Sequence, residues 1–585
     1  MDRPNMNRPQ IPCFAACLAL ALTLTSPRLH AEVADAVAST RDEIYAAEHL
    51  LDVRIEVAAK DWDQLRHQTR SLVGSLAQDR DQDSPFEYVP ADVTIDGQLI
   101  ENVGIRKKGF LGSLDNDRPS LKIRFDKYQA QAPFGDLDRL TLNNNKQDPS
   151  RLSQYLSYGM FRRAGIACSG CNFAKVSVNG KELGVYSNVE SIKRPMLKRS
   201  FGDGSGMLYE GTVADLVPGA TNRIEAKTKS SKMKPLKQIT DFLDGDHFDV
   251  EELDGMVDVE SFLRFWAVES LIGFWDGYTH NQNNFYLYRN PANAKFYFLP
   301  WGTDSAFTDF VPPIIDKIPN RSFHANAALP NRLYHTKESR QKYLQTLRGL
   351  LEDEWNEEDL LADIERVQAM LDETVLDKAA FGKAVQRVRG FIQGRRSRIE
   401  EELNRWPIPL RHGPRRPGYT KRLGEVTASF DTKWSTPFKF QSGLKGDAEI
   451  DLTLDGTPVK LNNPAATATP SKGDEPTITL SATRDSDKSP LSFSLTFRPS
   501  AFHPADASVG VGGVFIEGSM LTFLTMMSRN PSAIKLLDGT AELEQASTKV
   551  NAPVKGVAHF HIMQFAGGEK PKVAWEENST DKKQD

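Results

Sequence analysis

In the N-terminal part of the chain, hydrophobic positions alternate with polar ones, as they do in strands that bury one face. Residues 120–125 are typical, because three apolar side chains alternate with Lys122 and Arg124. Residues 93–100 predict a hairpin, since two apolar runs flank an Asp-Gly pair, which favours a tight turn. We therefore expect residues 53–128 to be rich in β-structure.

Further along, apolar residues recur every three or four positions, the spacing that places them on one face of an α-helix. One helix is predicted to begin at the Asp-Pro pair of residues 148–149, an N-cap followed by proline at the first helical position, and to stop at Gly165. Another begins at its N-cap Asp258 and ends directly before Asp276. Residues 339–404 predict three more helices.

The pattern changes again towards the C-terminus. The proline- and arginine-rich residues 411–425 are expected to be a linker. Short alternating runs such as 448–454 and 491–497 follow, separated by Gly, Pro, Asp and Asn. This pattern predicts an all-β accessory domain over residues 426–567, which we expect to be a sandwich. The charged residues 568–585 are expected to be a disordered tail.

The first 31 residues are typical of a secretory signal peptide. Arg3 and Arg8 give a positive start, residues 11–24 are apolar but too short to span a bilayer, and Ala31 offers a cleavage site. No other run is long and apolar enough for a membrane helix. We expect residues 1–31 to be removed and the mature chain to be exported, to the periplasm or the extracellular space, with no integral membrane segment.

The cysteine positions also bear on whether the chain is exported. Cys13 and Cys17 lie in the predicted signal peptide, and the residues before Cys17 match a lipoprotein site poorly, so a lipid anchor is a minor alternative. Cys168 and Cys171 remain, and they follow a predicted helix end instead of opening a helix, as a redox Cys-x-x-Cys would. A small local disulfide in an oxidising compartment is the favoured interpretation, with two unpaired thiols as the alternative.

Composition narrows the range of partners. The chain has 585 residues, of which 39% are hydrophobic and 26% are charged, and its net charge is −5. Its length is enough for two or more domains with a sizeable core. Nucleic-acid-binding proteins have a basic footprint, which this composition lacks, so no nucleic-acid partner is expected.

Candidate chemistry gathers around a second predicted hairpin, over residues 285–299. Asp276, Asn281 and Asn284 precede its first strand, and Asp304 follows its second. In an antiparallel pair these two points lie at the same end, so the four side chains should meet there. Carboxylate and amide oxygens suit magnesium and a phosphate-bearing substrate. Asp276 and Asn281 are also five positions apart, as are the Asp and Asn of a protein-kinase catalytic loop. The alternative is that these residues only form loops.

The same stretch carries a resemblance to a known family. Residues 275–278 (Trp-Asp-Gly-Tyr), 284–289 (Asn-Phe-Tyr-Leu-Tyr-Arg) and 299–307 (Leu-Pro-Trp-x-x-Asp-x-x-Phe) resemble the CotH-like, or spore coat protein H, family of atypical secreted protein kinases. The resemblance runs from about residue 53 to about residue 404. It implies an α+β, kinase-like domain over residues 32–410, with a β-rich N-terminal part and a helical C-terminal part. It also implies ATP and Mg²⁺ as cofactors and a protein hydroxyl as acceptor.

The resemblance extends to individual residues. It implies that Asp276 is catalytic, orienting the acceptor. Arg106, Lys108 and Lys122 become candidates to hold nucleotide phosphates, although most basic strand faces are simply solvated. Glu190 resembles a position that the family keeps acidic, and it could pair with Lys122 or form a structural ion pair.

The metal ligands come with one departure. Asn281, Asn284 and Asp304 are the candidate metal ligands. Many family members have Trp-Asp-x-Asp where this chain has Trp-Gly-Thr-Asp, so Gly302 replaces an Asp that looks metal-binding. The favoured interpretation is a secreted kinase in which Asp304 holds the metal. The alternatives are an inactive relative serving as a secreted binding or structural protein, a nucleotidyl transferase using the same site, and a metal-assisted hydrolase.

Overall fold

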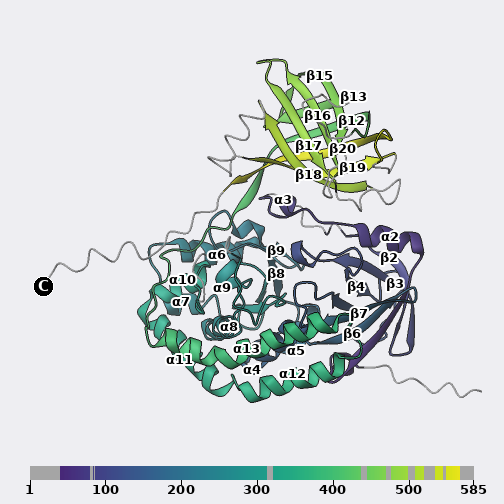
Figure 1. Cartoon of the computed structure of the whole chain (residues 1–585). Helices are drawn as coiled ribbons and strands as arrows, with labels where there is room; N and C mark the ends of the chain where they lie inside the picture. Colours follow the sequence, from purple (N-terminus) through teal and green to yellow (C-terminus); the bar gives the residue numbers. More distant parts are fainter. Residues whose placement is uncertain are drawn as a thin grey trace, which may run out of the picture. The chain divides into compact units, whose positions relative to one another are not determined.

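The structure is a computed structural model (Figure 1). It describes residues 40–78, 84, 86–312, 321–435, 445–469, 476–497, 508–518, 534–544 and 549–566. The predicted signal peptide, residues 1–31, and the predicted tail, residues 568–585, lie outside these ranges. Among the described residues, none of the helices has the length and apolar character that crossing a membrane requires.

The N-terminal part of the described chain is a closed β-barrel (Figure 1). Neighbouring strands follow the order β1-β2-β3-β4-β5-β7-β6, and a parallel pairing of β1 with β6 closes the barrel. The turn predicted at Asp96-Gly97 is confirmed, since both residues have positive φ angles between β2 and β3. The strands are β1 Leu50–Glu56, β2 Val89–Ile95, β3 Gln98–Lys108, β4 Ser120–Arg124, β5 Arg139–Asn143, β6 Cys171–Val178 and β7 Lys181–Val189.

The alternation seen in the sequence decides what each face of this barrel carries. Ile105 and Ile123 are fully buried in its apolar core. Arg106 and Lys122 lie opposite each other across β3 and β4, so both project from the other face. Lys108, two positions along β3, shares that face. The barrel therefore presents a group of basic side chains outside its core.

A four-stranded sheet and most of the helices follow. The sheet has the order β11-β10-β8-β9, made of β8 Met207–Gly211, β9 Glu225–Ala226, β10 Phe285–Arg289 and β11 Phe296–Pro300. The predicted hairpin is thereby confirmed as β10 and β11. Helix α8, Val259–Leu271, starts as predicted at Asp258, whose carboxylate accepts a hydrogen bond from Ser261 N at 2.9 Å. It packs against β11 and α11.

The three helices predicted within residues 339–404 are confirmed as α11, α12 and α13, which lie along one side of this part of the chain (Figure 1). Their bounds are Lys337–Asp353, Glu357–Leu371 and Lys378–Leu403. The remaining helices are α1 Arg41–Ile44, α2 Ala59–His67, α3 Leu72–Ser75, α4 Leu152–Arg163, α5 Arg194–Phe201, α6 Met233–Asp244, α7 Val250–Asp254, α9 Tyr278–Asn281 and α10 Ala328–His335.

Helix α4 begins later than predicted. Its N-cap is Arg151, in the left-handed region with a φ of 62°, so the chain turns sharply before the helix. The Asp148 carboxylate accepts hydrogen bonds from Ser150 N at 3.0 Å and from Ser153 N at 2.8 Å. The Asp-Pro pair therefore starts a turn instead of the helix itself, because the carboxylate bridges the turn to the first helical residues.

The C-terminal part is all-β, as predicted, but the expected sandwich was wrong. One sheet runs β12-β20-β19-β18-β17-β16-β15-β13-β14, and β12 also pairs with β13, which closes eight strands into a barrel. An alternating pattern shows only that a strand buries one face, which holds in both architectures. The strands are β12 Tyr419–Lys433, β13 Gly446–Leu454, β14 Thr457–Val459, β15 Leu461–Thr469, β16 Thr477–Arg484, β17 Pro490–Thr496, β18 Ser508–Glu517, β19 Lys535–Leu543 and β20 Pro553–Ala566.

The boundaries predicted at residues 32–410, 411–425 and 426–567 stay predictions. Strand β12 begins at Tyr419, inside the expected linker.

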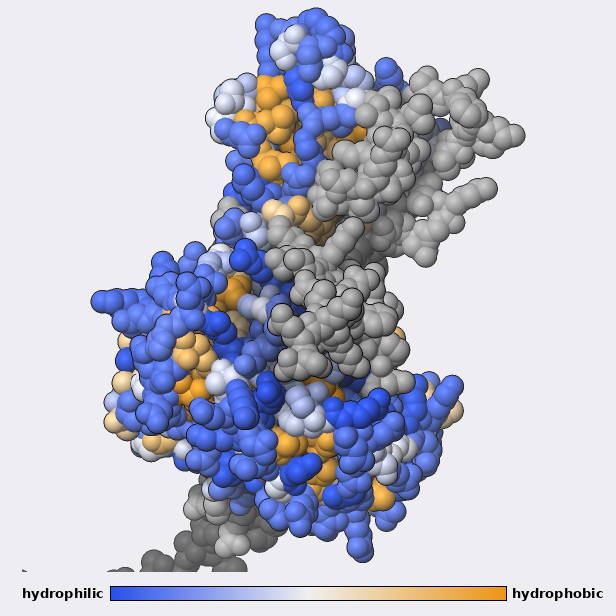
Figure 2. All heavy atoms as spheres, turned by 90° about the vertical axis from the view of Figure 1, so that its left-hand side faces the viewer, coloured by the Kyte–Doolittle hydropathy of each residue, from blue (hydrophilic) through white to orange (hydrophobic). Residues whose placement is uncertain are grey.

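The face drawn in Figure 2 is largely hydrophilic, with hydrophobic residues visible in separate patches.

The favoured disulfide was wrong, because Cys168 and Cys171 are both free thiols. Cys171 is buried with Tyr158 and Val189 in a small apolar cluster, while the Cys168 thiol donates to the Tyr158 carbonyl at 3.3 Å. Each thiol thus has its own packing environment.

Candidate active site

A buried glutamate fixes the loop that carries Asp276. The Glu269 carboxylate, on α8, accepts hydrogen bonds from the backbone N–H groups of Tyr278 and Thr279, each at 2.9 Å, and from the Thr279 hydroxyl at 2.5 Å. Burial raises the pKa of Glu269 to about 7. A Cβ atom at Gly277 would lie 2.3 Å from a Glu269 oxygen, so glycine is required for this close approach. The end of α8 and the start of α9 are thereby locked together around Asp276.

Three asparagine side chains hold the Asp276 carboxylate. Asn281 and Asn283 donate to one carboxylate oxygen, at 2.6 and 3.1 Å, and Asn284 donates to the other at 2.8 Å. Burial raises the pKa of Asp276, and these three hydrogen bonds act against that rise. No guanidinium or ammonium group bonds this carboxylate directly among the described residues. Asp276 is therefore oriented firmly without being neutralised.

Asp304 carries the second carboxylate of the site, on the turn after β11. Burial raises the pKa of Asp304 to about 7, and the nearby carboxylates of Asp276 and Asp148 add to the rise. The Lys108 ammonium lowers it. The structure thus brings Asp276 and Asp304 into each other's field at the same end of the β10–β11 hairpin, as the sequence predicted.

Lys108 lies between the basic face of the barrel and this turn. Its ammonium donates to the Asn143 amide oxygen and lies 5.8 Å from the centre of the Trp301 ring. Burial lowers the pKa of Lys108 to about 8, although the Asp304 charge raises it. Lys108 is therefore the strand cation whose charge acts on Asp304.

Lys122 and Arg106 extend the basic face. Burial holds the pKa of Lys122 well below its ordinary value, and the charges of Arg106, Lys108, Arg139 and Lys193 lower it further. Arg106 donates to the Ser84 hydroxyl and stacks over Tyr88, with 5.2 Å between guanidinium carbon and ring centre. Cations crowded in this way repel one another, so an anion placed among them is stabilised.

The amide oxygens of the two asparagines predicted as metal ligands, Asn281 and Asn284, face different groups. The Asn281 amide oxygen accepts a hydrogen bond from Arg415 at 2.8 Å, and Arg415 also donates to Gln282 at 2.9 Å. The Asn284 amide oxygen faces Gly302, where an added Cβ atom would lie 2.9 Å away. Asn281 therefore supports Asp276 in this structure, while Asn284 lies against the turn that leads to Asp304.

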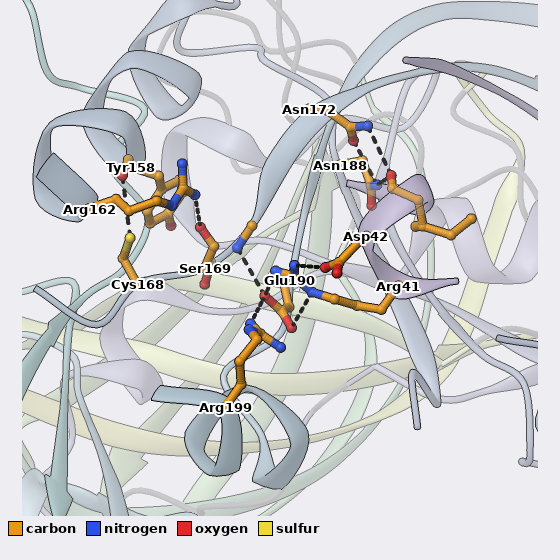
Figure 3. Close-up of polar contacts among 12 residues, drawn as sticks. Arg41, Asp42, Tyr158, Arg162, Cys168, Ser169, Asn172, Asn188, Glu190 and Arg199 are labelled. Carbon is orange, nitrogen blue, oxygen red and sulfur yellow. Dashed lines mark hydrogen bonds and ion pairs between the residues drawn. The ribbon is translucent and has the colours of Figure 1, made fainter. Parts of the chain in front are cut away.

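Glu190 lies elsewhere. Its carboxylate accepts hydrogen bonds from Arg41 and Arg199, each at 2.7 Å, and from Gly170 N at 3.0 Å (Figure 3). The structure does not bring it to Lys122. Of the two roles considered for Glu190, the structural ion pair is the one observed, because its two arginines come from helices α1 and α5.

The sequence analysis missed the carboxylate that does approach the basic face. Burial alone would raise the pKa of Glu210, on β8, but Lys227 at 2.8 Å, the Tyr286 hydroxyl and the Lys122 charge lower it to about 2. The only signal in the sequence is one acidic residue within a short apolar strand. Arg415 was also missed, because it lies in a segment expected to be a linker.

The donor set fits a magnesium–nucleotide complex. Among the described residues, no group of three or more His, Cys, Asp or Glu is arranged as a cage for a metal ion. Magnesium usually binds through one or two carboxylates together with substrate phosphates. Asp276 and Asp304 could supply the carboxylates, and Lys108 and Lys122 could contact the phosphates.

A carboxylate pair at the end of a hairpin, beside a basic strand face, defines a candidate phosphoryl-transfer site. Residues 105–403, about half of the chain, match the family model described as CotH kinase protein, and the chain belongs to this family. The C-terminal barrel lies outside the matched residues.

Individual relatives agree with this assignment. Inner spore coat protein H of Bacillus subtilis (strain 168) is 26% identical over 277 residues, which cover 43% of this chain and 74% of that protein. Invasin CotH2 of Rhizopus delemar is 24% identical over 245 residues, covering 37% of this chain and 41% of the relative. Invasin CotH3 of the same organism is 24% identical over 195 residues, covering 30% and 32%. The similarity thus spans less than half of the Rhizopus relatives.

Proposed function

We propose that the chain is a magnesium- and ATP-dependent kinase that transfers a phosphoryl group to a protein hydroxyl. One observation carries the proposal. The Asp276 carboxylate is held by three asparagine amides beside Asp304, whose own charge is opposed by Lys108. An oriented carboxylate next to a second carboxylate and a lysine is the arrangement that phosphoryl transfer requires.

Each residue has a role in this proposal. Asp276 orients the acceptor hydroxyl and takes up its proton, a role that its raised pKa supports. Asp304 and Asn284 would hold the magnesium ion, which supplies charge neutralisation for the phosphates. Asn281 orients Asp276, and its amide oxygen could reach a metal only after Arg415 releases it.

The basic face supplies the nucleotide contacts. Lys108, Lys122 and Arg106 bind the phosphates, and the energetic gain comes from relieving the repulsion among these cations. The Glu210 carboxylate, which is paired with Lys227, also lies within the field of the Lys122 charge. In this proposal Glu210 takes the part that the sequence had suggested for Glu190.

We place this activity outside the cytoplasm. Residues 1–31 have the pattern of a signal peptide, and the relatives are named as a spore coat protein and as invasins. These names support a surface or extracellular location.

The test is nucleotide binding and transfer by the purified full-length chain. Calorimetric titration with ATP should show binding with MgCl₂ and none with a chelator. Asp304→Asn should abolish this binding. Asp276→Asn should leave binding largely intact and stop transfer of a radiolabelled γ-phosphate. The matched control is Asp203→Asn, a partly exposed loop aspartate, which should change neither. Absence of nucleotide binding by the wild-type chain with any divalent metal would refute the proposal.

Gly302 favours one second candidate, a non-catalytic relative that serves as a secreted binding or structural protein. The chain has no carboxylate at this position, where many family members have Asp. If this second candidate is right, the wild-type chain will transfer no phosphate in the assay above, even if it binds nucleotide.

A further inference from the structure

A cavity of about 450 Å³ lies among α1, α4, α5 and the loop before β6, and its wall carries four arginines. They are Arg41, Arg162, Arg163 and Arg199. The cavity also contains Tyr158, which packs in one apolar cluster with Trp301, the residue before Gly302. It is therefore a neighbour of the candidate active site, but none of the residues proposed to hold magnesium or nucleotide lines it.

Two of these arginines are fixed in advance. Arg41 and Arg199 both point at the Glu190 carboxylate, which is almost fully buried (Figure 3). The same carboxylate accepts from Gly170 N, and a Cβ atom at Gly170 would lie 2.7 Å from the Arg41 guanidinium. The two guanidinium groups are therefore already ordered at the cavity wall, so a ligand that binds there would not have to order them at an entropy cost.

The charge of the cavity wall is not balanced by its own residues. Glu190 and Asp42 offset the charges of Arg41 and Arg199. Asp363, which supplies the carboxylate among the lining residues, is paired with Arg366. The positive charges of Arg162 and Arg163 are not offset by these carboxylates.

Polar groups of the wall are also left unused. The one hydrogen bond of Arg162 to the described residues goes to the Ser169 carbonyl, at 3.4 Å (Figure 3). Tyr45 lines the cavity with 7% of its surface exposed, and its buried hydroxyl bonds none of the described residues. A buried hydroxyl without a partner is unfavourable, and a ligand oxygen would satisfy it.

We propose that this cavity is a binding site for a small oxyanion, a molecule that bears carboxylate or phosphate groups. The planar guanidinium group matches both groups in a two-point hydrogen bond. The cavity volume is within the range of small-molecule sites. Arg162 and Arg163 supply the unbalanced charge, and the Tyr45 hydroxyl supplies a donor at the wall.

Two probes test the site on the full-length chain: citrate for carboxylates and inorganic phosphate for phosphates. Calorimetric titration and thermal unfolding should show that at least one of them binds the wild-type chain at millimolar concentration. Arg162→Gln should weaken that binding about tenfold, the effect of losing one charge-assisted contact. Tyr45→Phe should weaken it less. Arg162 is exposed, so its substitution leaves the core intact.

Two control variants identify the site. Arg405→Gln changes an exposed arginine outside the cavity, and Lys122→Ala changes the basic face of the barrel. Arg405→Gln should bind the probe as the wild type does, and Lys122→Ala, which alters the proposed nucleotide site, should keep the part of the binding that Arg162→Gln loses. Failure of both probes to bind would overturn the proposal. It would also be overturned if Lys122→Ala lost binding while Arg162→Gln kept it, or if all variants bound equally, since the anion would then bind elsewhere or adventitiously.

Discussion

Adding a side chain at Gly302 should disturb the support of Asp276. Gly302 has a φ of +56°, in the left-handed region, and an added Cβ atom would lie 2.9 Å from the Asn284 amide oxygen. The same Asn284 side chain donates to the Asp276 carboxylate at 2.8 Å. A substitution at Gly302 therefore strains the backbone and pushes on a residue that orients the candidate catalytic carboxylate.

The magnitude follows from two contributions. A residue other than glycine in the left-handed region costs about 1–2 kcal/mol. Displacing Asn284 loses a hydrogen bond to a charged group, which contributes about 1.5–3 kcal/mol. Gly302→Ala should therefore lower the free energy of unfolding by about 2.5–5 kcal/mol, the sum of the two contributions. Gly302→Asp should lose less from the backbone, because Asp tolerates this region better than Ala, but it meets the same crowding.

Urea denaturation measures both contributions when a matched control is included. Gly180 has a φ of +75° and open space around its added Cβ, so Gly180→Ala reports the backbone cost alone. The excess loss in Gly302→Ala should disappear when Asn284 is also replaced by Ala. If Gly302→Ala and Gly180→Ala lost the same free energy, the crowding argument would be wrong. The same argument predicts that Gly302→Asp does not strengthen the magnesium-dependent nucleotide binding proposed for the wild type.

Three further predictions follow from the same contacts. Because Asp304 has a raised pKa of about 7, a metal must displace its proton, so magnesium affinity in the presence of ATP should rise about tenfold from pH 6 to pH 8 in the wild type, as calorimetry would show, while Asp304→Asn should show no magnesium-dependent binding at either pH. The folded chain also binds the extra proton, so stability should fall as pH rises towards 7, and this slope should be shallower in Asp304→Asn. Arg415→Gln frees Asn281 and should slow phosphoryl transfer more than it weakens nucleotide binding, whereas the exposed neighbour variant Arg416→Gln should match the wild type. Glu190→Gln should cost about 1.5–3 kcal/mol in urea denaturation at neutral pH. Hydrogen bonds from Arg41 hold the pKa of Glu190 below its ordinary value, against the effect of burial. The stability that this ion pair contributes is therefore lost as pH falls through the lowered pKa. If the loss of stability at acidic pH were the same in Glu190→Gln as in the wild type, the ion-pair assignment would be wrong.

Local pattern predicted the hairpin that organises the site. Two aromatic-rich runs around a polar turn gave β10 and β11, and their antiparallel pairing placed Asp276 and Asp304 at one end. Alternation along β4 likewise predicted that Lys122 leaves the apolar core. Such features depend on residues close together in sequence, where the period of the pattern decides which way a side chain points.

Features that depend on distant pairing were not predictable in this way. The parallel pairing of β1 with β6 closes the N-terminal barrel, and the antiparallel pairing of β12 with both β20 and β13 closes the C-terminal barrel. Glu190 meets Arg41 from 149 positions away, and Asn281 meets Arg415 from 134 positions away. A charged or polar residue that becomes buried requires a bonding partner, but the sequence contains many residues that could serve as that partner.

The direction of the pKa shifts separates the acidic candidates by role. Glu190 and Glu210 have lowered pKa values, because each is bonded to a cation of the chain itself. Asp276 and Asp304 have raised pKa values, because burial, and for Asp304 also the nearby Asp276 charge, is not offset by a direct ion pair. A carboxylate that the fold satisfies stabilises the fold, whereas a carboxylate that the fold leaves unsatisfied gains most from an added cation. Among these four acidic residues, the two aspartates are thus the positions where an added cation would bring the larger electrostatic gain, while the two glutamates are already paired with cations of the chain.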